Sequence, residues 1–176
     1  MFGAYPRIIY CGCNIIFITP VQSLITTNPT ISEITFPFIA SNMSSAVSIY
    51  VAISIGDGVY KHWGIFIDAP RGEDKIFLQV AGSDGRFRYE LETRDVRQSE
   101  RLVELLPLYD VDVAEINSIK TVASQVTVHN EIRGWNCQDY VLDLLEALEK
   151  EGIVNSKDAR YKKQKDLLRG KQEGLA

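Results

Sequence analysis

Hydrophobic and polar residues alternate in short blocks between residues 47 and 82 of the chain. Three blocks, VSIYVAISI, VYKHWGIFI and KIFLQVAG, are rich in the β-branched and aromatic residues that favour strands. The intervening GDG and DAPRGED carry the Gly, Asp and Pro that are typical of turns. Strands joined by such short turns pair in the antiparallel direction. The pattern therefore predicts an antiparallel meander of three strands.

The next two segments have a weaker pattern. FRYELE, residues 87–92, predicts an additional edge strand. RLVELLPLYDV, residues 101–111, fits either a strand or a short helix, because its apolar run is short and Pro107 interrupts it.

Beyond residue 111 the apolar positions recur at the spacing of a helix. Asp112 can cap a first helix, and Asn136 is a good N-cap for a second helix that ends at Gly152. The last segment, NSKDARYKKQKDLLRG, predicts a basic helix capped by Asn155 or Ser156. The inward positions of the first two helices are Ile116, Ile119 and Ala123, and then Val141, Leu144, Leu145 and Leu148.

Strands followed by flanking helices predict an α+β domain with an antiparallel sheet. The chain has 176 residues, of which 45% are hydrophobic, which suits one domain with its own core. Residues 1–46 contain only two charged side chains and predict an irregular or poorly ordered extension. We expect the folded domain over residues 47–154 and the basic helix over residues 155–176. The apolar run of residues 7–25 is too interrupted to span a membrane and only faintly resembles a signal peptide.

Net charge and cysteine content indicate which partners, which compartment and which kinds of site to expect. The net charge of -4 argues against a nucleic-acid-binding surface, so small molecules or proteins are the expected partners. Cys11, Cys13 and Cys137 make an odd and sparse set, which predicts a reducing, cytoplasmic compartment rather than a disulfide framework. With only His62 and His129 to join them, they do not predict a metal site, and we expect no cofactor.

Cys137 lies at the predicted start of the second helix, on the same helical face as Val141 and Leu144. Unpaired backbone N–H groups and the positive end of the helix dipole favour a thiolate there. Free cysteine is also among the most buried residue types. The position therefore has two interpretations, an inert core cysteine or a nucleophile, and a nearby base would favour the second.

A candidate base and its orienting partner lie on the second and third predicted strands. If residues 68–73 form the connecting loop, Ile67 pairs with Asp74 and His62 lies directly opposite Gln79. An amide oxygen at that distance can accept a proton from the imidazole. A cysteine, a histidine and a third polar residue form the nucleophile, base and orienter arrangement.

Two motifs together carry a resemblance to a known superfamily. HWGIFI and the later NCQDYV resemble the circularly permuted papain-like superfamily, which includes lecithin:retinol acyltransferases, NlpC-type relatives and desumoylating isopeptidases. In these families a histidine on a strand precedes a cysteine on a helix, often within an Asn-Cys-x-x-aromatic motif that Asn136, Cys137 and Tyr140 match. The resemblance covers about residues 47–154, and the two segments resemble in particular a group of small fungal proteins of this type.

The resemblance implies a thiol-dependent hydrolase or acyltransferase that acts on an amide, ester or thioester bond. Cys137 would be the nucleophile, His62 the base and Gln79 the third member, where many relatives have His or Asn. The expected partner is an acyl or peptide substrate. The alternative is a catalytically silent binding module of the same fold, because a fold does not guarantee activity.

Further residues are candidates for the same site, each with a structural alternative. Trp63 and Trp135 can line a substrate site or belong to the core, and Tyr50 can donate to an oxyanion or simply pack on its strand. Gly64, beside His62, leaves room for a substrate, and His129 ranks second as a base. The basic terminal helix can touch an anionic membrane, although a solvated or internally paired face is favoured.

Overall fold

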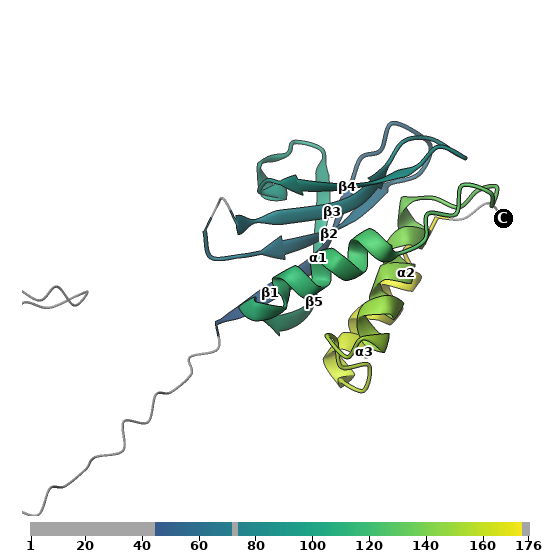
Figure 1. Ribbon diagram of the computed structural model, residues 1–176. Helices are drawn as coiled ribbons and strands as arrows, with labels where there is room; N and C mark the ends of the chain where they lie inside the picture. The colour runs from purple at the N-terminus through teal and green to yellow at the C-terminus, as the bar shows by residue number, and fades with distance from the viewer. Residues whose placement is uncertain (1–44, 72–73, 174–176) are drawn as a thin grey trace, which may run out of the picture. The chain divides into compact units, whose positions relative to one another are not determined.

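The computed structural model describes residues 45–71 and 74–173 of the chain (Figure 1). The chain divides into two units, Met1–Ala40 and Ser41–Ala176, and the fold below belongs to the second. The predicted N-terminal extension, with Cys11 and Cys13, lies outside the described residues.

Five antiparallel strands form one sheet in the order β4-β3-β2-β1-β5 (Figure 1). Their bounds are β1 (Ala46–Ser54), β2 (His62–Asp68), β3 (Ile76–Ala81), β4 (Arg88–Thr93) and β5 (Leu102–Asp112). The first four strands form a meander, which confirms the predicted α+β class and the predicted edge strand.

The ambiguous segment of residues 101–111 is a strand, and it pairs with β1 on the far edge of the sheet rather than with β4. Pro107 lies on this edge strand, opposite Tyr50 and beside a register shift. A residue without a backbone N–H is tolerated at such a place, because an edge strand leaves half of its donors unpaired.

The register of β2 and β3 differs from the predicted one by two residues. Ile67 pairs with Ile76 and not with Asp74, because Lys75 remains outside the strand, where it forms ion pairs with Asp68 and Asp95. In this register His62 does not lie directly opposite Gln79. A shift of two residues keeps each side chain on its own face of the sheet, whereas a shift of one would not.

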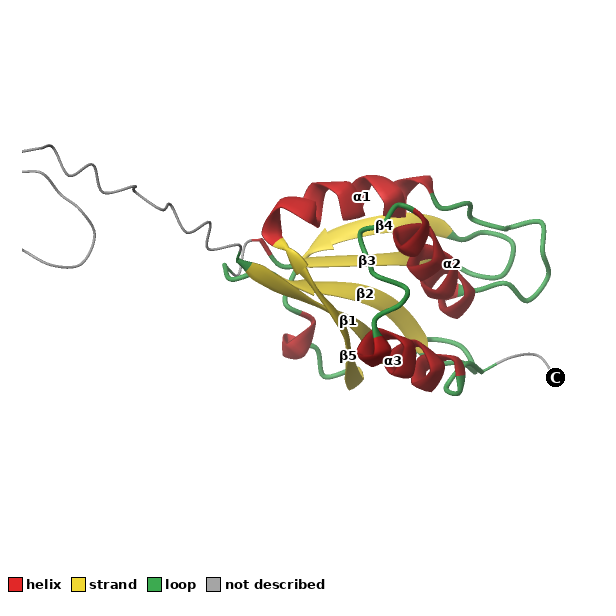
Figure 2. Cartoon of the chain, turned by 90° about the horizontal axis from the view of Figure 1, so that it is seen from below, coloured by secondary structure: helices red, strands yellow, loops and turns green. Residues whose placement is uncertain are grey.

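Three helices lie on one face of the sheet (Figure 2). Asp112 caps a short 3-10 turn, Val113–Glu115, that leads into α1 (Ile116–Gln125). Asn136 caps α2 (Cys137–Lys150) as predicted, and Gly152, at a φ of 73°, follows its end. The third helix, α3 (Ala159–Arg169), begins later than the predicted cap at Asn155 or Ser156. Its N-cap is Asp158, whose side chain accepts from the Tyr161 N–H.

None of the described helices is both long enough and apolar enough to cross a membrane.

The sheet has a core on each face. The larger core lies under the helices and joins Trp63, Ile65 and Leu78 of the strands to Cys137, Tyr140 and Leu144 of α2. The smaller core, on the other face, consists of Ala52, Phe66, Phe77 and Val96.

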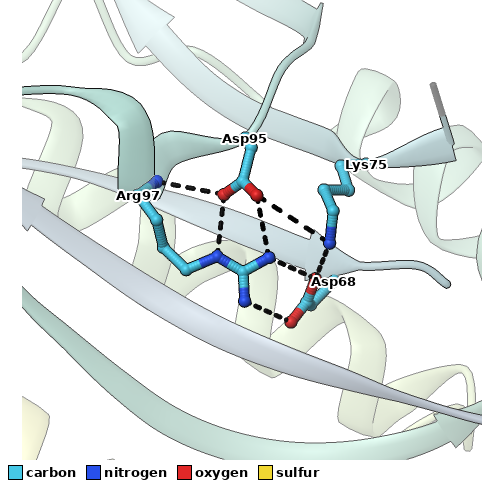
Figure 3. Close-up of polar contacts among 4 residues, drawn as sticks. All are labelled: Asp68, Lys75, Asp95 and Arg97. Atoms are coloured by element: carbon cyan, nitrogen blue, oxygen red, sulfur yellow. Dashed lines mark hydrogen bonds and ion pairs between the residues drawn. The ribbon is translucent and has the colours of Figure 1, made fainter. Parts of the chain in front are cut away.

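Residues 94–101 connect β4 to β5 and include the 3-10 turn η2 (Val96–Gln98). Val96 of this turn belongs to the smaller core. The Arg94 guanidinium lies 4.5 Å from the centre of the Phe77 ring, and that of Arg97 lies 5.5 Å from the Phe66 ring. Figure 3 shows how Asp95 and Arg97 of this connection interact with Asp68, at the end of β2, and Lys75, just before β3. The connection is thereby held against β2 and β3.

Candidate active site

Cys137 is the first residue of α2 and is 7% exposed. The helix begins here because Asn136 and Asp139 form a capping box, in which each side chain binds the backbone of the other. The Cys137 Sγ lies 4.0 Å from the Lys61 carbonyl oxygen, and the Trp63 N–H interacts with the sulfur. The thiol therefore contacts the peptide groups on both sides of His62.

The first turn of α2 meets β2 where its pairing with β3 has ended. The pairs between β2 and β3 run from Ile67 only as far as Ile65. Ahead of them, the Lys61 carbonyl accepts a hydrogen bond of 2.9 Å from the Gln138 Nε2. The fully buried Gln138 thus ties the helix start to the strand start.

His62 and Gln79 are brought together, as predicted. The His62 Nε2 lies 2.6 Å from the Gln79 Oε1. His62 is half-buried and Gln79 is 7% exposed. The contact is diagonal rather than direct across the strands, because of the register shift. The Gln79 Nε2 in turn donates to Glu92 on β4, whose other oxygen lies 2.7 Å from the Arg94 Nε.

The thiol and the imidazole are neighbours through the backbone rather than through a hydrogen bond. Side chains alternate along β2, so His62 lies on the face of the smaller core with Phe66, whereas Cys137 belongs to the larger core. Within the described part of the chain, no hydrogen bond joins the Cys137 Sγ to the His62 ring. The structure thus joins His62 to Gln79, the predicted base and orienter, and places the thiol beside the same strand position.

Burial keeps both groups neutral near pH 7. It raises the pKa of Cys137, and the Asp139 charge adds to this, while the N–H groups of Trp63 and Gln138 only partly oppose it. Burial also lowers the pKa of His62, in spite of the hydrogen bond that its Nε2 donates to Gln79. The predicted gain in thiolate at the helix start is wrong for this state, because burial outweighs the field of the helix.

The segment after α3 covers the first turn of α2. The Glu173 N–H donates to the Gln138 Oε1 at 2.7 Å, and the Glu173 carboxylate accepts from the Lys61 N–H at 2.7 Å and from its Nζ at 2.5 Å. The Gln172 Nε2 donates to Asp139 at 2.8 Å. Sequence reasoning missed these residues. Gln138 could have been noticed as a polar residue beside Cys137, but nothing in the sequence singles out Glu173.

The other predicted residues lie around this centre with little free surface. Trp63 is 1% exposed, and Trp135 is 7% exposed with its Nε1 bonded to Asp143, so burial favours the core interpretation of both. Tyr50 packs beside Phe66, at 6.3 Å between ring centres, in the smaller core. Their roles in substrate binding stay predictions.

The space beside Gly64 is already filled, contrary to the expectation of room for a substrate. A Cβ on Gly64 would lie 2.4 Å from the Phe77 ring. His129 lies in the loop before α2, where its Nδ1 is 2.8 Å from Glu131. A small cavity of about 70 Å³ adjoins the site instead, and it is lined by Ile53, Lys61, Trp63, Val103, Glu104 and Lys171.

Comparison with known proteins gives one match. No curated protein and no solved structure matches the chain. The model of a family of unknown function (DUF6540) matches residues 49–155, which include the whole of the site except its C-terminal cover. The chain belongs to this family.

Proposed function

We propose that this member of the DUF6540 family is a thiol-dependent hydrolase or acyltransferase of permuted papain-like architecture. The observation that carries the proposal is the position of the Cys137 Sγ, at a capped helix start and against the peptide groups that flank His62. The bond between His62 and Gln79 supports it, because a base held by a third polar residue recurs in thiol and serine enzymes. The substrate is an acyl compound or a peptide.

In the proposed reaction His62 takes the proton of the Cys137 thiol as the sulfur attacks a carbonyl carbon. The oxyanion accepts from the Cys137 N–H, and loss of one such donor typically costs about 100-fold to 1,000-fold in rate. His62 then gives its proton to the leaving amine, alcohol or thiol, which leaves a thioester on Cys137. Water or another acyl acceptor gives its proton to His62 and attacks the thioester, and the Cys137 sulfur takes that proton from His62 as it leaves.

Because both groups are neutral at rest, the reaction starts from thiol and imidazole rather than from an ion pair. The two groups must also come closer than they are here. His62 lies on the face of the smaller core and Cys137 belongs to the larger core, so the approach must take place around the start of β2, ahead of the pairs between β2 and β3.

A catalytically silent binding module is the second candidate. The burial of Cys137 and its raised pKa favour this alternative, since a reactive cysteine is usually accessible and acidic. Both candidates predict the same fold, so chemistry at Cys137 must separate them.

Acylation by p-nitrophenyl acetate is a direct test. The enzyme should release p-nitrophenol in a burst and carry one acetyl group on Cys137, seen by mass spectrometry of the intact chain and its peptides. Cys137→Ser should abolish the burst and His62→Asn should slow it at least 100-fold. His129→Asn is the matched control, because the other histidine lies in a loop and pairs with Glu131. Absence of acylation from pH 6 to pH 10, or equal rates in both histidine variants, would support the silent module.

A further inference from the structure

A row of polar side chains crosses three neighbouring strands on the face of the smaller core. It runs from His62 on β2 through Gln79 on β3 to Glu92 on β4, and then to Arg94 just beyond that strand. The members are joined by the 2.6 Å contact between His62 and Gln79, by the bond from Gln79 to Glu92, and by the 2.7 Å ion pair with Arg94.

The chemistry of Glu92 fixes the direction of every bond in this row. An ionised carboxylate only accepts hydrogen bonds, so the amide nitrogen of Gln79 must face it. The amide oxygen of Gln79 then faces His62 and can only accept. The Nε2 of His62 must therefore carry the proton, and in the neutral ring the Nδ1 is left without one.

Arg94 forms an ion pair with Glu92 on the side away from Gln79. Its Nε faces the Glu92 Oε2, while its guanidinium lies over the Phe77 ring, which limits its freedom to move away. Glu90 provides an internal comparison. It lies directly opposite Gln79 in the strand pairing but forms its ion pair with Arg88 instead.

We propose that Glu92 is a positioning residue that locks the Gln79 amide, and through it the Nε2–H tautomer of His62. The Nδ1 is thereby kept free as the proton acceptor. The last step rests on the proposed function, because only a catalytic His62 uses the Nδ1 as a base. The tautomer itself does not depend on any activity.

The test is long-range ¹H–¹⁵N NMR of the two histidines, at a pH where the rings are neutral. Wild type should show a protonated Nε2 and an unprotonated Nδ1 for His62. In Glu92→Gln the side chain at 92 can donate as well as accept, so the Gln79 amide is free to flip and the His62 signals should move toward the Nδ1–H form. Glu92→Asp should restore part of the wild-type pattern, and Glu90→Gln should leave it unchanged.

Two results would overturn the proposal. One is a wild-type His62 in the Nδ1–H form, and the other is an unaltered His62 spectrum in Glu92→Gln. Glu92 is 37% exposed on an edge strand, so the variant is expected to fold. If the tautomer shifts as expected while p-nitrophenyl acetate acylates neither protein, the positioning role stands and the proposed enzyme function fails.

A different observation carries a second inference, about access to the same thiol. Residues 172 and 173 are hydrogen-bonded to Lys61, just before β2, and to Gln138 and Asp139 in the first turn of α2. Lys171, which precedes them, is fastened to β5 by an ion pair of 2.9 Å with Glu104. We infer that residues 171–173 form a strap that restricts entry to Cys137 and must loosen for the thiol to react.

The strap is tested by the rate at which iodoacetamide alkylates Cys137, which requires no catalytic activity. Glu173→Ala removes the carboxylate that binds Lys61 and should raise this rate severalfold. Asp166→Ala is the matched control, because that carboxylate is on α3 and, among the described residues, its ion pair is with Arg169, at 3.9 Å. An unchanged rate in Glu173→Ala and in the Gln172→Ala/Glu173→Ala double variant would refute the strap, whether or not the wild type hydrolyses an ester.

Discussion

At the scale of single residues, Cys137 is subject to two opposing effects. The N–H groups of the helix start stabilise a negative sulfur, and burial against the larger core destabilises it. Burial is the larger effect, so the pKa of the thiol is raised. The thiol therefore stays protonated at neutral pH in the closed structure.

The first prediction concerns this thiol. Since its pKa is raised, alkylation of Cys137 by iodoacetamide should be slow at pH 7 and should increase up to and beyond the pKa of an ordinary thiol. Each unit by which a pKa is raised lowers the thiolate fraction at neutral pH about tenfold. The rate is followed by mass spectrometry of the peptide that contains Cys137, with Cys137→Ser as the blank. A rate that reaches its plateau below pH 7 would contradict the burial argument.

The second prediction concerns the pH dependence of stability due to His62. The His62 pKa is lowered by burial and by Arg94, and Gln79, Asp57 and Glu92 oppose this. The unfolded chain thus binds a proton below about pH 6.5 that the folded chain resists. The free energy of unfolding should be steady above that pH and fall below it, by at most about 1.4 kcal/mol per pH unit for one proton.

Urea unfolding of wild type, His62→Gln and His129→Gln between pH 5 and pH 8 measures this effect. The decrease between pH 6.5 and pH 5 should be smaller in His62→Gln than in wild type. If His62→Gln and wild type instead have parallel pH profiles, His62 does not resist protonation.

At the scale of elements, α2 both supports the larger core and positions the candidate nucleophile. Leu144 and Val141 are fully buried, and the capping box sets the residue at which the helix starts. The capping box thus fixes where Cys137 meets β2, while the apolar face holds the helix in place.

The third prediction separates these two roles. Cys137→Ser nearly preserves volume and can donate to the Lys61 carbonyl, so the unfolding free energy should change little. Leu144→Ala should lower it by about 2–5 kcal/mol, because a cavity remains in the core. Thermal unfolding of both variants checks this. A serine variant as unstable as Leu144→Ala would show that Cys137 serves mainly in packing.

Local chemistry explains which elements could be predicted. Asn136 and Gly152 delimit α2 by capping rules alone. Alternation places His62 and Gln79 on one face both in the predicted register and in the observed one, because the two differ by two residues. The register itself was wrong because Lys75 is held by Asp68 and Asp95, which requires knowing where the distant η2 connection lies. Sequence patterns do not contain that information.

The same limit applies to the site. The pairing of His62 with Gln79 depends on neighbouring strands and was predictable. The burial of Cys137 and its cover by Glu173 depend on a contact between the end of the chain and its middle. The spacing of residues along a short segment cannot predict such a contact. The resemblance that suggested the site also ends near residue 154, before Glu173.

At the scale of the whole molecule, β5 is the strand that departs from a simple meander. It leaves β4 on one edge of the sheet and pairs with β1 on the other. Strands lie about 4.8 Å apart, so the path across the sheet is roughly 19 Å. Residues 94–101 can extend over at most about 29 Å, so they can cross the sheet although part of the connection is coiled in η2.

This crossing connection affects the order in which the chain folds. The meander β1–β4 closes only short loops, whereas the pairing of Ser54 with Leu102 closes a loop that contains the whole of β2, β3 and β4. Closing the longer loop costs more chain entropy before any contact is gained. We therefore expect β5 to dock after the folding transition state, when η2 is drawn across a sheet that has already formed.

The last prediction follows from that order. Arg97→Ala, which removes the link from η2 to Asp68, should accelerate unfolding and leave the folding rate nearly unchanged, a φ-value near zero. Ile65→Val, within the meander, should instead slow folding. Stopped-flow chevron plots of both variants measure the two rates. A high φ-value at Arg97 would mean that the crossing connection is part of the nucleus and that the sheet assembles from its outer strands inward.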